Sequence, residues 1–135
     1  MVVLDASVIL KWVLPDEAGT GRALQWRDRH INGSDTIAVP DLLFYEAANV
    51  LAMTLHLPKS AAWEAWSSLA AMELAVFAPS IKEMRRAMEI ARIYRVSVYD
   101  ACYAALAEAL ECRFVTADIR LAHRLARLPI AVETF

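Results

Sequence analysis

Four acidic side chains occupy positions in the sequence from which a fold could gather oxygen ligands. They are Asp5, Glu46, Asp100 and Asp118. Asp5 directly follows the apolar run Val2–Leu4, and Asp118 follows the β-like run Arg113–Thr116. If both runs are central strands of a parallel sheet, their carboxyl ends meet at one edge, where open α/β sheets bind ligands. This placement indicates one shared site for the two aspartates.

Three of these acids also have a structural alternative as helix caps. Asp5 and Asp118 each come just before a predicted helix, and aspartate is a good N-cap residue. Asp100 ends the segment Ser97-Val-Tyr-Asp100, which matches a capping box, where the third helical residue reaches back to the cap amide. Capping and a functional role are compatible, so the sequence leaves both open for these residues.

Glu46 has no such alternative nearby. In the predicted helix 42–56 it completes an apolar stripe formed by Leu43, Val50, Met53 and Leu57. A buried glutamate is costly without a partner, and no lysine or arginine stands at positions 42, 43, 49 or 50. Its charge therefore needs a distant basic side chain or a cation shared with the other acids, and we favour the cation.

Charge repulsion decides what must accompany four carboxylates at one place. Two carboxylates about 4 Å apart repel by about 4 kcal/mol at an effective dielectric constant of about 20. Either some of them take up protons or a divalent cation lies among them. Oxygen ligands suit Mg²⁺ or Mn²⁺, whereas the lack of paired histidine or cysteine ligands disfavours zinc. The glycines form no phosphate-loop or dinucleotide-loop spacing.

A sheet flanked by helices would position these residues. Short β-like runs alternate with longer helical stretches, which predicts an α/β fold with a central, mostly parallel sheet in a single domain spanning residues 1–135. We expect strands at Val2–Leu4, Ile37–Val39, Val76–Ala78, Arg113–Thr116 and Ile130–Val132. We expect helices at about 6–13, 18–31, 42–56, 60–74, 81–95, 99–112 and 119–128, with ends accurate to about two to four residues.

The composition is that of a compact, helix-rich globule. Of the 135 residues, 59% are hydrophobic and 22% charged, and the net charge of −2 argues against a general DNA-coating protein. Cys102 and Cys112 would lie about 15 Å apart along one helix, too far for a disulfide. We see no signal peptide, and Lys11 and Pro15 interrupt the early apolar stretch, so we expect no membrane association and a cytoplasmic location.

A basic stripe is predicted beside Asp118. Arg120, Arg124 and Arg127 recur at i, i+4 and i+7 of the helix that follows it. They could hold phosphates close to a metal, or they could be the solvated face of an ordinary amphipathic helix.

Two further helices carry apolar stripes that predict core contacts. Trp63 and Trp66 lie on one face with Leu69 and Ala70, and we favour core packing for this tryptophan pair. In the predicted helix 81–95, we expect the inward face to contain Ile81, Met84, Met88 and Ile93.

Four segments, in this order, resemble the PIN-domain ribonucleases. They are Val3-Leu-Asp5-Ala-Ser7, Pro40-Asp-Leu-Leu-Phe-Tyr-Glu46-Ala-Ala-Asn-Val-Leu51, Tyr99-Asp100-Ala-Cys-Tyr-Ala-Ala-Leu-Ala107 and Phe114-Val-Thr116-Ala-Asp118-Ile-Arg-Leu121. In size and motif order, nearly the entire chain is similar to the VapC toxins of bacterial and archaeal toxin–antitoxin pairs. No single segment would suffice for this assignment, but the ordered set is specific.

The resemblance implies a Mg²⁺- or Mn²⁺-dependent endonuclease that acts on structured RNA. It makes Asp5, Glu46, Asp100 and Asp118 the acidic quartet of the family, with Ser7 and Thr116 as accessory hydroxyls. Some relatives carry a further acid shortly after the fourth, where this chain has Arg120, Leu121, Ala122 and His123. The resemblance also implies a cognate antitoxin whose helix lies in a groove beside the early helices, and a homodimer or a toxin–antitoxin hetero-oligomer.

A metal held by the quartet would lower the pKa of a coordinated water, orient the scissile phosphate and neutralise the leaving oxygen. We expect Asp5 and Asp118 to be direct ligands, and Glu46 and Asp100 to bind directly, to bind through water, or to take the proton from the attacking water. The alternatives are a PIN nuclease that processes RNA, and a receiver-like phosphoacceptor domain, which also gathers aspartates around Mg²⁺ but would not account for Glu46.

Overall fold

A five-stranded sheet whose paired strands all run parallel forms the centre of the computed structural model, which describes residues 1–14 and 18–135. Pro15, used above as an interruption of the early apolar stretch, lies outside the described residues. The strands are β1 (Val2–Leu4), β2 (Ile37–Pro40), β3 (Ala75–Phe77), β4 (Arg113–Thr116) and β5 (Val132–Thr134). Their order in the sheet is β3-β2-β1-β4-β5, which places β1 in the middle. This confirms the predicted α/β fold and parallel sheet.

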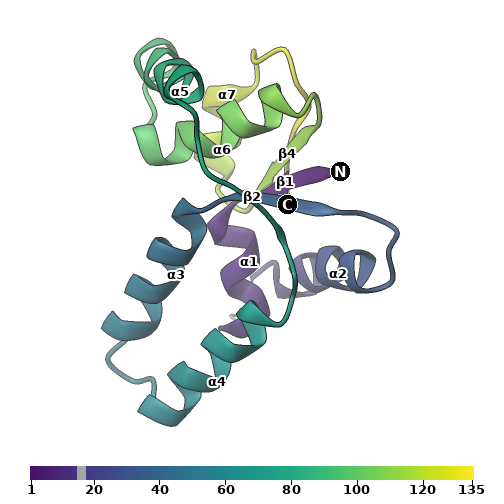
Figure 1. Cartoon of the computed structure of the whole chain (residues 1–135), viewed down its shortest axis with the longest axis vertical. Coiled ribbons are helices and arrows are strands. Elements are labelled where there is room, and N and C mark those ends of the chain that lie inside the picture. Colours follow the sequence, from purple (N-terminus) through teal and green to yellow (C-terminus); the bar gives the residue numbers. More distant parts are fainter. Residues whose placement is uncertain (15–17) are drawn as a thin grey trace.

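Seven helices in the described part of the chain flank this sheet. They are α1 (Ala6–Val13), α2 (Thr20–Ile31), α3 (Leu42–Met53), α4 (Lys59–Ala70), α5 (Ile81–Tyr94), α6 (Val98–Ala109) and α7 (Ile119–Leu125). In Figure 1, α5, α6 and α7 gather at the top, α3 and α4 extend below, and α1 runs down from the sheet beside α3. Helix α6 contacts β1, β2 and β4, whereas α1 contacts α2, α3 and α4.

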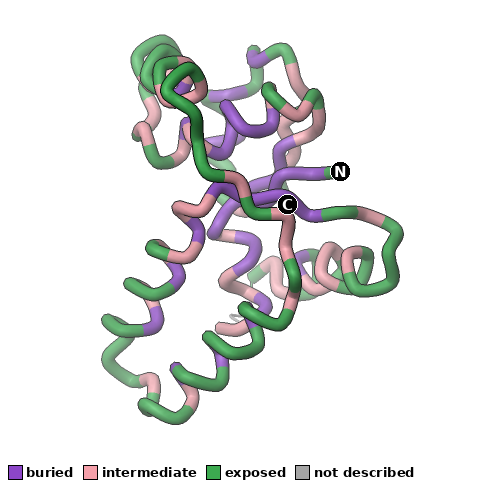
Figure 2. Tube along the Cα trace, in the orientation of Figure 1, coloured by how far each residue is buried: buried purple, intermediate pink, exposed green. Residues whose placement is uncertain are grey.

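The core is densest where the middle strands meet α1 and α6. Every residue of β1 is fully buried, because helices cover both faces of a central parallel strand. The alanine-rich inward face of α6, including Ala101, Ala104 and Ala107, is also buried and lets that helix approach the sheet closely. Figure 2 shows this buried centre in purple and the outer turns of α3 and α4 in green.

Serine caps start the two helices that pack on each other at one end of the molecule. Ser80 accepts the Glu83 backbone N–H at 3.1 Å and its own N–H donates to Glu83 Oε2 at 2.7 Å, which completes a capping box for α5. Ser97 Oγ accepts the Asp100 N–H at 3.0 Å at the start of α6. These caps fix where the first turn of each helix begins.

Most predicted element ends differ from the observed ones by one to four residues. Strand β5 begins two residues later than expected, at Val132, and α3 ends at Met53 because Thr54 takes up an extended conformation. Helix α6 ends at Ala109, so Cys112 lies beyond it, and both cysteines are free thiols. None of the helices described by the structure has the length and apolarity needed to cross a bilayer.

Several predicted core positions are wrong. The buried face of α3 runs through Leu43, Ala47 and Leu51 at i, i+4 and i+8, so Met53 is 68% exposed. On α4, Leu69 is buried as predicted, but Trp63 is 61% exposed and Trp66 is 37% exposed, because Ala62 and Ala65 complete the buried face. In α5 the buried residues are Ala87 and Ile90, while Ile81, Met88 and Ile93 face water. Alanines share the inward faces of these helices with leucine and isoleucine, and several larger apolar side chains stay exposed.

Candidate active site

Asp5 lies at the carboxyl end of the middle strand. Its backbone N–H donates to the Val115 carbonyl at 2.9 Å, which joins the end of β1 to β4, and only 6% of the residue is exposed. It stands at the N-cap position of α1, but its side chain makes no capping hydrogen bond. The capping alternative therefore does not account for this carboxylate.

Two hydroxyls hold the Asp5 carboxylate. Ser7 Oγ donates to Asp5 Oδ2 at 2.5 Å, and Thr116 Oγ1 donates to the same oxygen at 2.7 Å. The hydroxyls are themselves fixed by backbone donors: the Ala117 N–H lies 3.0 Å from Ser7 Oγ, and the Asp118 N–H lies 3.0 Å from Thr116 Oγ1. Oδ1 of Asp5 receives no side-chain hydrogen bond within the described chain, and the Ala6 backbone N–H also stabilises this carboxylate.

Asp118 caps α7 as the sequence allowed. Its Oδ1 accepts the backbone N–H groups of Arg120 at 2.9 Å and of Leu121 at 3.1 Å. The residue is exposed, unlike Asp5, and is joined to it through Thr116, which accepts the Asp118 N–H and donates to Asp5. Capping occupies one carboxylate oxygen, so it does not remove the second from the site.

Glu46 lies on the second turn of α3 and is half-buried. Its partner is neither lysine nor arginine but the hydroxyl of Tyr103 on α6, which donates to Oε2 at 2.5 Å. Tyr103 is fully buried, and its ring stacks on Phe114 of β4 with centroids 6.4 Å apart. The distant basic partner that the sequence left open is not found among the described residues.

Asp100 lies half-buried in the first turn of α6, one turn before Tyr103. The capping box predicted here forms only in part. Ser97 accepts the Asp100 N–H, but within the described chain the Asp100 carboxylate makes no hydrogen bond back to the cap. The capping role belongs to Ser97, and the Asp100 carboxylate is available to the site.

Burial and mutual repulsion raise the pKa values of two of these acids. Desolvation is the main cause for Asp5; the hydrogen bonds from Ser7 and Thr116 lower its pKa in part, and the Asp100 charge raises it. Desolvation is also the main cause for Glu46, whose pKa the Tyr103 hydroxyl lowers and the Asp5 and Asp100 charges raise. The carboxylates of Asp5, Glu46 and Asp100 are therefore close enough to repel one another, as expected of acids gathered without a neutralising charge.

The donor chemistry suits a hard divalent cation. Ion pairs in the described chain involve other acids, namely Asp28, Asp35, Glu89, Glu108 and Glu133. In residues 1–14 and 18–135, no three acidic, histidine or cysteine side chains are close enough to hold one ion directly. Mg²⁺ commonly keeps several waters and takes one or two carboxylates, so this looser arrangement fits it better than a closed zinc site.

The predicted basic stripe is shorter than expected. Arg120 and Arg124 are exposed on α7, but that helix ends at Leu125 and Arg127 lies in the following turn. A guanidinium N–H of Arg124 donates to the Arg95 carbonyl at the junction of α5 and α6, so this side chain also has a structural contact. Arg120 and Arg127 are both exposed, and Arg120 lies two residues after Asp118.

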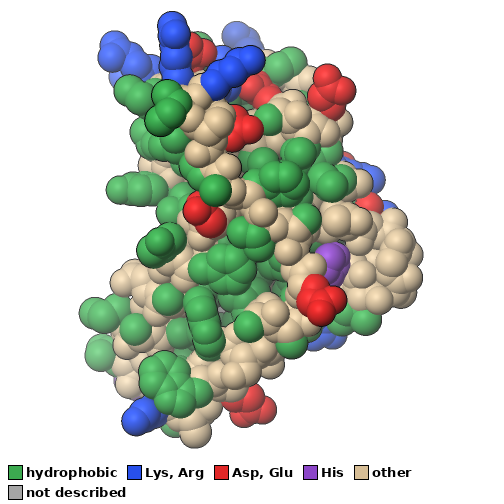
Figure 3. Space-filling view, in the orientation of Figure 1, with side chains coloured by type: hydrophobic (Ala, Val, Ile, Leu, Met, Phe, Trp, Pro, Cys, Tyr) green, Lys and Arg blue, Asp and Glu red, His purple; other side chains and the backbone are tan. Residues whose placement is uncertain are grey.

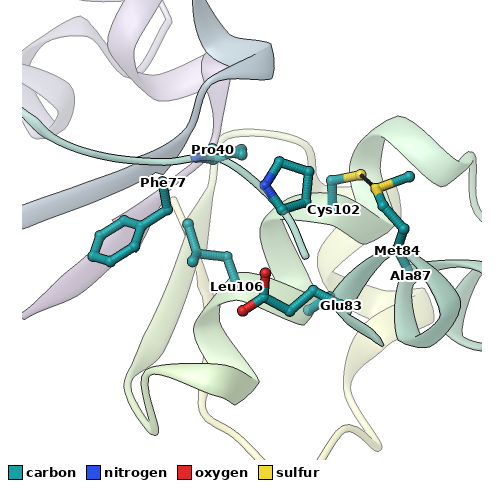
Figure 4. A pocket seen from close by; sticks show the side chains of 9 residues that line it. Pro40, Phe77, Glu83, Met84, Ala87, Cys102 and Leu106 are labelled. Carbon is teal, nitrogen blue, oxygen red and sulfur yellow. Dashed lines mark hydrogen bonds between the residues drawn. The ribbon is translucent and has the colours of Figure 1, made fainter. Parts of the chain in front are cut away.

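An apolar pocket beside α5 and α6 offers no comparable chemistry. Figure 4 shows it between Phe77, Leu106 and the sulfur atoms of Cys102 and Met84, which are 3.9 Å apart. The Glu83 carboxylate at its edge belongs to the α5 capping box. Burial, with the nearby Glu46 and Asp41 charges, raises the pKa of the Cys102 thiol, which disfavours the nucleophilic thiolate.

Tyr103 is the residue that sequence reasoning missed. It stands three positions after Asp100 on an alanine-rich helix, so it shares a face with that acid. A lone aromatic residue with a polar tip on such a face was the available signal.

Comparisons with known proteins identify the family of the chain. The PIN domain family model matches residues 2–128. The chain is 34% identical to the VapC ribonuclease Mb0985 of Mycobacterium bovis and to ribonuclease VapC9 of Mycobacterium tuberculosis, over 98% of this chain and 98% of each relative. It is 28% identical to ribonuclease VapC3 of Pyrobaculum aerophilum, over 94% of this chain and 96% of the relative.

Solved structures share the fold. VapBC2 from Rickettsia felis, bound to a DNA fragment from its promoter, aligns with a TM-score of 0.72 and 16% identity over 100% of this chain and 99% of the other. A toxin–antitoxin complex from Klebsiella pneumoniae aligns with a TM-score of 0.71 and 13% identity over 99% and 97%. At these identities the likeness is one of fold.

Proposed function

The chain belongs to the PIN domain family, and we propose that it is a Mg²⁺- or Mn²⁺-dependent endoribonuclease that acts as the toxin of a type II toxin–antitoxin pair. The observation that carries this proposal is Asp5: a buried acid at the end of the middle strand, with a raised pKa, two hydroxyl donors and no basic partner in the described chain. The PIN domain match favours a nuclease over a phosphoacceptor receiver.

The buried and the exposed acids would have different roles in the site. A divalent cation bound here supplies an activated water and neutralises charge at the leaving oxygen. Asp5 would hold it from the buried side through Oδ1, and Asp118 would hold it from the exposed side through the oxygen that does not cap α7. Glu46 and Asp100 would add the negative charge that balances the cation, and they would accept the proton of the attacking water. Hydrolysis of this kind uses no ribose hydroxyl.

RNA is proposed as the substrate because the three named relatives are ribonucleases. Arg120, two residues after Asp118, and Arg127, in the turn after α7, are exposed and could contact phosphates flanking the scissile bond. A housekeeping PIN nuclease that processes RNA would share this site, so the site alone does not separate it from a toxin. An RNA-directed toxin would act in the cytoplasm.

An antitoxin partner is proposed for the exposed apolar surface of α3 and α4, since two of the similar structures are toxin–antitoxin assemblies. Figure 3 shows hydrophobic side chains over this lower part of the molecule. The exposed ones on α3, α4 and their connection are Tyr45, Met53, Leu55, Trp63 and Trp66. A groove between α1 and α4, lined by Trp12, Val13, Leu57 and Ala65, could take an amphipathic helix. A homodimer or toxin–antitoxin hetero-oligomer is the expected assembly.

The test is cleavage of labelled RNA by the purified, partner-free chain. We expect cleavage with Mn²⁺ or Mg²⁺, none with EDTA, and loss of cleavage in Asp5→Asn and Glu46→Gln, both checked for folding by circular dichroism. Lys59→Ala, an exposed change at the far end of α4, is the matched control. Cleavage by folded Asp5→Asn at the wild-type rate would refute the site.

A growth experiment separates the toxin from the RNA-processing alternative. Induced expression of the wild-type chain should arrest growth, and co-expression of a small neighbouring-gene protein should relieve the arrest. Harmless expression of an enzyme that cleaves RNA in vitro would favour a processing nuclease.

A further inference from the structure

We propose that Tyr103 is a positioning residue whose hydroxyl holds the Glu46 carboxylate in the orientation in which it serves the metal. The inference deepens the proposed function and rests on it. Its basis is the contact between the fully buried Tyr103 hydroxyl on α6 and Glu46 Oε2 on α3, at 2.5 Å. Helices α3 and α6 are separated along the chain by α4, β3 and α5, so the contact joins two distant segments at the site.

Glu46 needs such a contact more than the other acids do. Asp5 is held by two hydroxyls and Asp118 by two backbone N–H groups, and both have short side chains. Glu46 has one more rotatable bond, and within the described chain the Tyr103 hydroxyl is its one hydrogen-bond donor. Without that donor, several rotamers open to the carboxylate, and binding a cation would have to fix one of them.

The Tyr103 ring is itself held in place. It packs against Phe114 with an interplanar angle of 26°, and Phe114 lies two residues before Thr116, which holds Asp5. Tyr103 also lies on the same face of α6 as Asp100, one turn away. Residues of α6 and β4 thus contact both Glu46, through Tyr103, and Asp5, through Thr116.

A purely structural role explains the pair less well. Phenylalanine would fill the same space and stack on Phe114 without placing a phenol away from water, which carries a desolvation cost unless it is hydrogen-bonded. Glu46 carries a similar cost on the other side of the contact. A pair that costs desolvation on both sides and lies beside two further acids, Asp5 and Asp100, is better explained by positioning for a ligand than by folding.

The test measures Mn²⁺ binding by calorimetry in the full chain without RNA. Tyr103→Phe should weaken binding by about 10-fold, the lower end of the range for residues that orient metal ligands. Tyr94→Phe is the matched control, because the Tyr94 hydroxyl makes a long contact of 3.5 Å outside the site; it should bind like wild type. The metal-free thermal midpoint of each variant shows whether any loss comes from unfolding.

A double-mutant cycle separates positioning from a structural effect. If Tyr103 acts through Glu46, Tyr103→Phe should change Mn²⁺ affinity by less than about twofold in a Glu46→Gln background. Equal losses in both backgrounds, or wild-type affinity in folded Tyr103→Phe, would overturn the positioning role alone. No Mn²⁺ binding by the wild-type chain would overturn the metal site and this inference with it.

A measurement on the wild-type sequence keeps the inference testable if Tyr103→Phe does not fold. In chain labelled with 3-fluorotyrosine, Mg²⁺ should shift the ¹⁹F resonance of Tyr103 more than that of exposed Tyr99. The Tyr103 signal is assigned by elimination with Tyr→Phe changes at the other three tyrosines. A Tyr103 resonance unmoved by saturating Mg²⁺ would overturn the positioning role.

Discussion

Replacing Thr116 by valine should destabilise the protein by about 2.5–4 kcal/mol, although it removes a single oxygen and keeps the shape of the side chain. Thr116 is fully buried, donates to Asp5 Oδ2 at 2.7 Å and accepts the Asp118 N–H at 3.0 Å. A hydrogen bond to a charged group contributes about 1.5–3 kcal/mol, and a buried donor left without an acceptor costs about 1–3 kcal/mol. The Asp118 N–H is partly accessible to water, so the lower part of the summed range applies.

Urea unfolding of the metal-free chain measures this loss. With a slope of about 2 kcal/mol per molar, the midpoint of Thr116→Val should fall by about 1–2 M. Thr54→Val is the matched control, because its hydroxyl donates to the Val50 carbonyl on an exposed helix end; such a change is usually worth less than about 0.5 kcal/mol. If Thr116→Val lowers the free energy of unfolding no more than Thr54→Val does, the Thr116 hydroxyl does not stabilise Asp5.

Three further outcomes are expected. Because the pKa values of Asp5 and Glu46 are raised above 3.8 and 4.5, the folded chain binds more protons than the unfolded one above these values, and the metal-free unfolding free energy should fall as pH rises from about 4 towards neutrality. Asp5→Asn should flatten that slope in urea titrations, and an unchanged slope would contradict the assignment. Asp118→Asn should keep the α7 cap and its stability while losing RNA cleavage, whereas Asp118→Ala should also lose about 1 kcal/mol; active Asp118→Asn would leave the residue a cap alone. Arg120→Ala should weaken RNA binding and reduce its salt dependence by about one phosphate contact, measured by anisotropy at several salt concentrations, and an unchanged salt dependence would exclude a phosphate contact.

The fold could be predicted from the sequence because its strands have unambiguous local signals. Strands β1 and β4 have the predicted bounds, and the parallel pairing of Leu4 with Val115 follows from two buried runs separated by helices. That pairing brings Asp5 and Asp118 to one edge of the sheet, as the sequence led us to expect. Chain order and strand periodicity were sufficient for this part of the site.

Helix faces were predicted less well, because the largest apolar residues did not mark the inward side. On α4 the tryptophans Trp63 and Trp66 are exposed while Ala62 and Ala65 are buried. Close packing of a helix selects small residues, and a periodicity argument that weights side chains by size therefore chooses the wrong face. The Glu46–Tyr103 contact lay beyond sequence reasoning for another reason: its residues are 57 positions apart and depend on how α3 and α6 meet across the sheet.

The sequence could not decide whether these carboxylates are helix caps or metal ligands. In the structure, one carboxylate can have both roles. Asp118 gives Oδ1 to the α7 cap, Asp5 gives Oδ2 to two hydroxyls, and Glu46 gives Oε2 to Tyr103. In each of the three, hydrogen bonds to protein fix one oxygen and thereby orient the other. A carboxylate held in this way loses little freedom when it binds a cation, which lowers the entropic cost of binding. The hydrogen bonds that suggested a purely structural role for these carboxylates therefore also orient their second oxygens for a cation.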